Sequence, residues 1–191
     1  MNRSHQDFIS QGHGKTGPWV DLVNSLEWDT YGNPTDHLDN PAGIAFFLRQ
    51  WHVVKPARDS APVANLKALR SVLRKSCEGL SAGEPIPASQ LRTLNEVLNV
   101  AGKQQVIQRQ NGLRIEFVPE TSGWDWIMAE VVRSFADTLS GGETARIKFC
   151  RNNNCRWLFY DATKARTRRW CSSKSCGNRE RVRRSRARTQ R

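Results

Sequence analysis

Four cysteines in the last quarter of the chain carry the clearest chemical signal in this sequence. Cys150, Cys155, Cys171 and Cys176 follow the spacing C-x4-C-x15-C-x4-C. Two close pairs joined by a short loop supply the four thiolates that one tetrahedral Zn²⁺ ion binds. Because four cysteines fill the coordination shell, the spacing predicts one structural zinc ion. It leaves no position for the activated water of a zinc hydrolase.

Two other uses of these thiols stay open at this point. The sequence shows no apolar run of signal-peptide type and no membrane-spanning segment, which normally needs roughly 20 apolar residues. We therefore expect a cytoplasmic protein without a membrane partner, in which reduced thiols favour a metal over two disulfides. An iron–sulfur cluster also takes four thiolates, but the basic residues around the cysteines favour a binding module. The fifth cysteine, Cys77, falls on an apolar helical stripe and is expected to be buried.

Positive charge is concentrated beside the cysteines. The chain has 191 residues and a formal net charge of +12. Residues 144–191 contain 16 of the 30 lysines and arginines and only two acids, so this segment carries +14 and the preceding 143 residues carry −2. Such asymmetry predicts a basic module attached to a nearly neutral body.

The local patterns around the cysteines predict a small treble-clef-like zinc module. Residues 146–149 and 157–160 read as two strands of a hairpin, with a turn-prone knuckle at 151–154 between them. A polar loop at 161–168 follows, and Ser172 or Ser173 could cap a basic helix from about Lys174 to Arg188. The aromatic residues expected to form the core of this module are Phe149, Trp157, Phe159 and Trp170.

The body, residues 1–143, is predicted to be mostly helical with a small β-hairpin, which places the chain in the α+β class. Apolar residues recur at helical spacing over 19–28, 41–51, 63–80, 91–98 and 124–139. Asn111-Gly112 is a strong hairpin-turn dipeptide between two strand-like stretches. Ser140-Gly141-Gly142 ends the last helix, so we expect two domains, 1–143 and 144–191.

Short motifs in both segments give the sequence a family resemblance. Cys150-x4-Cys155, Arg169-Trp170-Cys171-Ser172 and Cys176-Gly177-Asn178-Arg179 resemble the CGNR zinc finger, and residues 181–188 resemble its basic helix. The body is similar to the ABATE domain that usually precedes this finger, through Asp21-Leu22-Val23-Asn24-Ser25-Leu26 and the helix pair between Leu66 and Leu98. Proteins of this kind are regarded as bacterial stress-induced transcription regulators. The resemblance therefore implies DNA binding.

The basic helix and the residues next to the cysteines are the candidate nucleic-acid contacts. Arginine can neutralise phosphates, with six contacts giving a log–log salt slope of about −5 on B-DNA, and it can also read guanine edges. Asn178 could pair with adenine, but for Gly177 and Asn178 we favour a structural role beside the metal ligands. The candidate set is Arg168, Arg169, Lys174, Asn178, Arg179, Arg181, Arg183, Arg184, Arg186 and Arg188.

The body could supply the input of a regulator. Asp21, Asn24, Trp28 and Trp51 are polar or aromatic groups near the first two helices and could line a small-molecule pocket. The simpler interpretation is that the tryptophans are core residues. The body could also form a homodimer that presents two basic modules to a two-fold DNA site. Without a nucleophile elbow, phosphate loop or HExxH pattern, we do not expect an enzyme.

Two hypotheses from different classes follow. The first is a zinc-containing DNA-binding protein, a bacterial transcription regulator whose four-cysteine module and arginine-rich helix contact DNA while the body senses a ligand or dimerises. In that case the protein would associate with the nucleoid when bound. The second is an RNA-associated or structural zinc protein whose basic segment binds phosphate without reading sequence.

Overall fold

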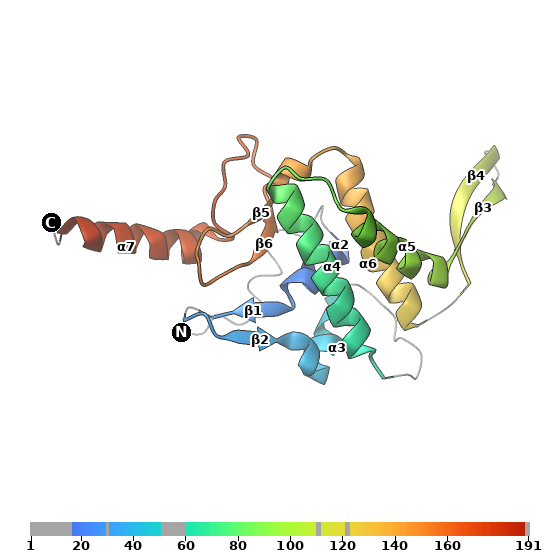
Figure 1. Ribbon diagram of the computed structural model, residues 1–191, viewed down its shortest axis with the longest axis horizontal. Helices are drawn as coiled ribbons and strands as arrows, with labels where there is room; N and C mark the ends of the chain where they lie inside the picture. The colour runs from blue at the N-terminus through green and yellow to red at the C-terminus, as the bar shows by residue number, and fades with distance from the viewer. Residues whose placement is uncertain (1–16, 30, 51–59, 110–111, 121–122, 190–191) are drawn as a thin grey trace.

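The computed structural model describes residues 17–29, 31–50, 60–109, 112–120 and 123–189. Within these ranges, helices form the body, and three two-stranded antiparallel sheets are attached to it (Figure 1). The helices of the body are α2 (Gly17–Asn24), α3 (Pro41–Gln50), α4 (Val63–Ser81), α5 (Ala88–Ala101) and α6 (Trp124–Ser140). The strand pairs are β1 (Leu26–Trp28) with β2 (Pro34–Asp36), β3 (Gly102–Arg109) with β4 (Gly112–Pro119), and β5 (Ile147–Phe149) with β6 (Leu158–Tyr160). These elements confirm the predicted α+β class.

The short helix α2 lies at the centre of the body. Trp19, Leu22 and Val23 are fully buried on it, as a helix that is apolar almost all round requires. The Trp19 ring packs edge-to-face on Phe135 of α6, and its indole N–H donates to Thr138 Oγ1 at 3.0 Å. Helices α4 and α6 pack on α2, and α5 packs on α6 and α4, so the main core is helical.

The first predicted helix was too long. We expected helix over 19–28, whereas α2 ends at Asn24 and residues 26–28 form strand β1. Ser25 terminates the helix: its hydroxyl and its N–H both donate to the Leu22 carbonyl. Strand pairing with β2 then satisfies the backbone of 26–28, a tertiary partner that helical periodicity cannot reveal.

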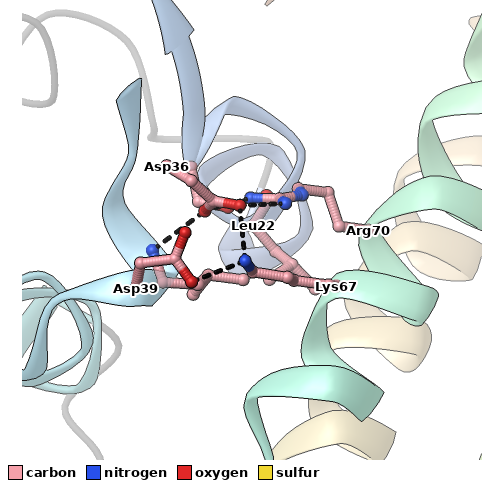
Figure 2. Close-up of polar contacts among 7 residues, drawn as sticks. Leu22, Asp36, Asp39, Lys67 and Arg70 are labelled. Carbon is pink, nitrogen blue, oxygen red and sulfur yellow. Dashed lines mark hydrogen bonds and ion pairs between the residues drawn. The ribbon is translucent and has the colours of Figure 1, made fainter. Parts of the chain in front are cut away.

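A buried ion pair fastens the β1–β2 hairpin to α4 (Figure 2). Arg70 of α4 donates to both carboxylate oxygens of Asp36, at 2.7 and 2.6 Å, and to Ser25 Oγ at 2.8 Å. Lys67 lies one turn earlier and bridges Asp36 and Asp39. Burial alone would raise the pKa of Asp36, but hydrogen bonds from Arg70, the Leu38 N–H and Lys67 lower it. The charged form of Asp36 is therefore part of the fold.

Removing the arginine of this ion pair tests its contribution. Arg70→Met is expected to reduce the free energy of unfolding by about 3 kcal/mol, because a mostly buried carboxylate loses its main partner. The carboxylate contributes stability above the pKa of an unfolded aspartate, about 3.9, and loses it as the pH falls through the lowered folded pKa. Urea unfolding followed by circular dichroism measures both effects.

Two companion variants make the Arg70 result specific. Adding Asp36→Asn to Arg70→Met should recover part of the loss, since no unpaired charge remains. Arg92→Met, at an exposed position of α5, should leave the urea midpoint unchanged. An Arg70→Met protein as stable as the parent would contradict this account.

The turn dipeptide at 111–112 lies partly outside the described residues, but the hairpin predicted around it is confirmed. Strands β3 and β4 pair in continuous register from Gly102 opposite Pro119 to Arg109 opposite Gly112. The hairpin extends from the body at the end of the molecule opposite to the C-terminal helix (Figure 1).

The β5–β6 hairpin joins the zinc module to the core of the body. Ile147 and Leu158 are buried in the same cluster as α2 and α4, and Phe149 packs against that cluster too. This corrects one expectation, because Phe149 was predicted to belong to the module's own core. Phe159, Trp157 and Trp170 do pack around the cysteines as predicted. None of the helices in the described part of the chain is long and apolar enough to cross a membrane.

Candidate metal centre and nucleic-acid interface

The four predicted cysteines come together in one cluster. Their Sγ atoms all lie within 4.8 Å of one another. Cys155 Sγ is 3.6 Å from Cys171 Sγ, which is 3.7 Å from Cys176 Sγ. A tetrahedron with Zn–S bonds of about 2.3 Å has edges of about 3.8 Å. The cluster therefore has the size and ligand chemistry of a single structural zinc site.

The same distances decide between the alternatives. A disulfide needs an S–S separation of about 2.05 Å, and all five cysteines are free. A cluster of several iron atoms holds its thiolates further apart than one ion does. Cys77 lies in the main core, where burial raises the pKa of its thiol and keeps it protonated. The candidate metal ligands are thus Cys150, Cys155, Cys171 and Cys176.

Local sequence builds each half of the cluster. Cys150 follows β5, and Cys155 closes a knuckle in which the Cys155 N–H donates to the Asn152 carbonyl at 2.9 Å. On the other side, the Ser172 hydroxyl accepts from the Ser175 N–H and caps a π-helical turn, η4 (Ser173–Gly177), which contains Cys176. The predicted serine cap is confirmed. The turn continues directly into α7 (Asn178–Thr189), so the metal anchors the first turn of the basic helix.

The residues of the Cys176-Gly177-Asn178-Arg179 motif differ in their surroundings. Gly177 and Arg179 support the cysteine cluster, whereas the side chain of Asn178 faces solvent. A Cβ on Gly177 would lie 3.2 Å from Trp170, so glycine lets η4 pack closely on that ring. Arg179 donates to Cys176 Sγ at 3.4 Å, which stabilises a thiolate ligand. Asn178 is exposed.

Sequence reasoning missed the buried carboxylate at the centre of the module. Asp161 is fully buried and accepts from Lys148 Nζ at 2.7 Å, from the Arg168 N–H at 2.9 Å, and from the N–H and hydroxyl of Thr163. Burial alone would raise the pKa of Asp161, but these donors lower it. The available signal was its rarity, because Asp161 and Glu180 are the two acids in 144–191. Asp161 orders the loop that leads to Cys171.

The guanidinium of Arg168 is bound within the module and is not available on the surface. Its Nε donates to the Trp170 carbonyl at 2.9 Å, and its Nη2 contacts the Cys171 carbonyl. The guanidinium carbon lies 4.7 Å from the centre of the Phe159 ring. We predicted Arg168 as a nucleic-acid contact. Its geometry instead assigns it to fixing the backbone on both sides of a zinc ligand.

The remaining candidates form an exposed basic surface. Helix α7 has 12 residues, none of them buried, and it projects away from the body (Figure 1). Arg183 and Arg184 each pair with Glu180, at 2.8 and 2.9 Å, while their own side chains stay mostly exposed. The exposed candidate residues are Arg169, Lys174, Asn178, Arg179, Arg181, Arg183, Arg184, Arg186 and Arg188.

Asn24 connects the body to the zinc module instead of facing a pocket. Its amide donates to the Leu158 carbonyl at 2.9 Å and accepts from the Leu158 N–H at 2.9 Å. This pair of bonds imitates the pairing of a neighbouring strand along β6. The side chain is buried, so its hydrogen-bonding groups are satisfied by protein.

Trp28 also lies in this contact between the body and the zinc module, which we call the joint. The guanidinium groups of Arg74 and Arg156 lie 5.1 and 5.3 Å from its ring centre, and Arg74 donates to the Arg156 carbonyl at 2.9 Å. Asp21 is buried on α2, and Trp51 lies outside the described residues. Two of the four residues predicted to line a ligand pocket, Asn24 and Trp28, therefore join the body to the module instead.

The space between α2 and α3 is almost filled. A hollow of about 10 Å³ remains there, too small to hold more than a single water. Its lining is entirely apolar and consists of Leu22, Leu38, Ile44, Phe47, Leu48, Leu66 and Trp124.

A charge substitution at the joint should uncouple the two parts. Asn24→Asp keeps the acceptor for the Leu158 N–H but points a carboxylate oxygen at the Leu158 carbonyl. We expect a loss of about 3 kcal/mol, as for a buried charged group without a donor, and faster amide exchange at Leu158. Asn95→Asp, at an exposed site of α5, is the matched control. Unchanged protection of Leu158 in Asn24→Asp would contradict the proposed joint.

Comparison with protein families agrees with this architecture. The CGNR zinc finger model matches residues 146–189. The ABATE model, described as a "putative stress-induced transcription regulator", matches residues 17–142 and so covers more than half of the chain. No curated protein sequence matches the chain significantly. The two matches follow each other in the order of the helical body and the four-cysteine module, and the chain therefore belongs to the ABATE family, with a CGNR zinc finger after the ABATE domain.

Proposed function

We propose that this protein is a DNA-binding transcription regulator in which the zinc module presents α7 to DNA. The observation that carries the proposal is α7 itself, which bears six arginines and one acid and buries none of its residues. It follows directly on the turn η4, which contains the candidate zinc ligand Cys176. A helix that is charged all round gains nothing from a protein core. A polyanion is the partner that would stabilise it.

The dimensions of α7 suit a DNA groove. Twelve helical residues extend about 18 Å, and a B-DNA major groove is about 12 Å wide and admits one helix. Arg181, Arg184 and Arg188 share one face of the helix and, among the described residues, only Arg184 has an acidic partner. Arginine binds guanine O6 and N7, and an exposed asparagine such as Asn178 suits adenine.

Zinc acts here as a structural element rather than a reactive one. Four thiolates complete its coordination, so the site has no open position for water or substrate. Its chemistry is to hold the knuckle, η4 and the start of α7 in one orientation. The proposal is accordingly one of binding rather than catalysis.

The body would regulate through the joint with the module. Asn24 and Trp28 connect α2 and β1 to β6 and the knuckle, so a change in the packing of α2 would alter the orientation of α7. Ligand sensing and homodimerisation by the body remain predictions. Sedimentation of the free and DNA-bound protein would test dimerisation.

Competition binding tests the proposed function directly. Binding-site sequencing of the tagged protein first supplies a duplex, which is labelled and bound. Unlabelled random duplex and structured RNA are then added as competitors. For a regulator, far more random duplex or RNA than unlabelled selected duplex should be needed to displace the labelled duplex. The reason is that specific binding is typically 10³–10⁷-fold tighter than non-specific binding. Equal displacement by all competitors would favour the RNA-associated or structural zinc protein and overturn the regulator.

A further inference from the structure

A basic groove runs between the α4–α5 turn and the zinc module. Its volume is about 730 Å³. One side is formed by the end of α4 and the following turn, through Leu80, Ser81 and Gly83. The other side is formed by β5 and the segment that precedes Cys171. Its basic lining residues are Lys148, Arg151, Arg166, Arg168 and Arg169.

Two of these five cations are available for a ligand. Lys148 pairs with the buried Asp161, Arg166 lies 3.4 Å from Glu143, and Arg168 holds backbone carbonyls. The side chains of Arg151 and Arg169 are exposed and have no acidic partner among the described residues. A backbone hydrogen bond from the Arg151 N–H to the Arg169 carbonyl, 3.0 Å long, keeps the two residues adjacent. Their positive charges therefore face the same groove without neutralisation.

Arg169 also connects this groove to the basic helix. A second hollow of about 170 Å³ lies at the start of α7, and Arg169 lines it together with Arg181 and Arg184. One arginine thus belongs to both hollows. Glu180, which pairs with Arg184, lines this second hollow as well. The two hollows together are therefore bordered by several basic residues and one acid.

We propose that this groove binds the sugar–phosphate backbone of DNA beyond the segment contacted by α7. Arg151 and Arg169 would each contact a phosphate, and the apolar lining from Leu80 and Phe149 would lie against sugar. A backbone suits the groove better than a small free anion, because the basic residues are spread over two hollows that share Arg169. This inference rests on the proposed DNA binding and adds a contact made partly by the body.

The test compares a double variant with a matched control. Arg151→Ala with Arg169→Ala should weaken binding to all duplex sequences by a similar factor. It should also lower the magnitude of the log–log salt slope by about 2, since each phosphate contact contributes about 0.9. Arg49→Ala with Arg92→Ala removes the same charge from exposed positions of α3 and α5 outside the groove and should leave the slope unchanged. Zinc content of one per chain in both proteins confirms that the module is folded.

The possible results separate the groove from the helix. If the parent binds duplex and the double variant binds with the same slope, the groove proposal is overturned while the proposed function stands. If the parent binds no duplex, both are overturned. Calorimetric titration with inorganic pyrophosphate supplies the other phosphate source: loss of pyrophosphate binding in the double variant without any change in duplex binding would overturn the DNA-backbone proposal.

Discussion

Replacing Cys176 by serine is expected to abolish zinc binding and unfold the C-terminal module. Cys176 is fully buried and contributes one of the four sulfurs of the cluster, and a serine hydroxyl is not a thiolate. Structural zinc contributes about 10–16 kcal/mol of apparent binding free energy in zinc-finger peptides. A module of this size has too little core to fold without it. Metal analysis should fall from about one zinc per chain to none.

The effect is expected to spread beyond the module. Ile147 and Leu158 are part of the main core, and Leu158 also pairs with Asn24. Loss of the β5–β6 hairpin would expose this side of α2 and α4. Thermal unfolding followed by circular dichroism should show a lower midpoint for the helices of the body too, both in Cys176→Ser and in the parent treated with a chelator.

The fifth cysteine supplies the control for the zinc experiment. Cys77→Ala removes a buried thiol from α4 and should cost about 1–2 kcal/mol through a small cavity, yet keep one zinc per chain. In the parent, the four ligand thiols should resist alkylation until a chelator is added. A Cys176→Ser protein that retains one zinc per chain would refute the assigned ligand set.

Removing three arginines from α7 is expected to weaken DNA binding about 100-fold at 0.1 M salt. Arg181→Ala, Arg184→Ala and Arg188→Ala together remove one face of the helix. Three lost phosphate contacts would reduce the magnitude of the log–log salt slope by about 3. Fluorescence anisotropy at several salt concentrations measures affinity and slope together.

The matched control removes the same charge elsewhere. Arg49, Arg92 and Arg133 are exposed on α3, α5 and α6, and replacing all three by alanine should leave the slope within about 1 of the parent's. Both triple variants should retain one zinc per chain. If they weaken binding equally, net charge rather than α7 would be responsible for the interaction.

The position of the zinc module could not be predicted from the sequence. Residues 146–149 and 157–160 were expected to form a hairpin, and they do, but their alternation does not say what covers each face. The structure packs Ile147 and Leu158 against α2 and α4 and leaves Phe159 with the cysteines. The side chains of this one hairpin therefore belong to two different cores, and only the three-dimensional packing decides which side chain belongs to which core.

The roles of single polar residues also depended on contacts distant in sequence. Asn24 and Leu158 are 134 residues apart, so no local pattern links them. Arg168 resembles its neighbour Arg169 in sequence, yet one guanidinium binds carbonyls beside a zinc ligand and the other is exposed. The sequence shows which residues are charged, but it does not show which of those charges remain free to bind a ligand.

What the sequence determined by itself is the local chemistry. The cysteine spacing predicted the metal site, because four thiolates close together in the chain need few other residues to meet. The arginine density predicted a basic helix, and helical periodicity predicted most of the body. Tertiary structure alone decided that Asn24 and Trp28 join the body to the module, that Asp161 orders the loop before Cys171, and that Arg151 and Arg169 face a common groove. Those relationships arise from packing between distant segments, where burial and hydrogen-bond satisfaction fix the role of each side chain.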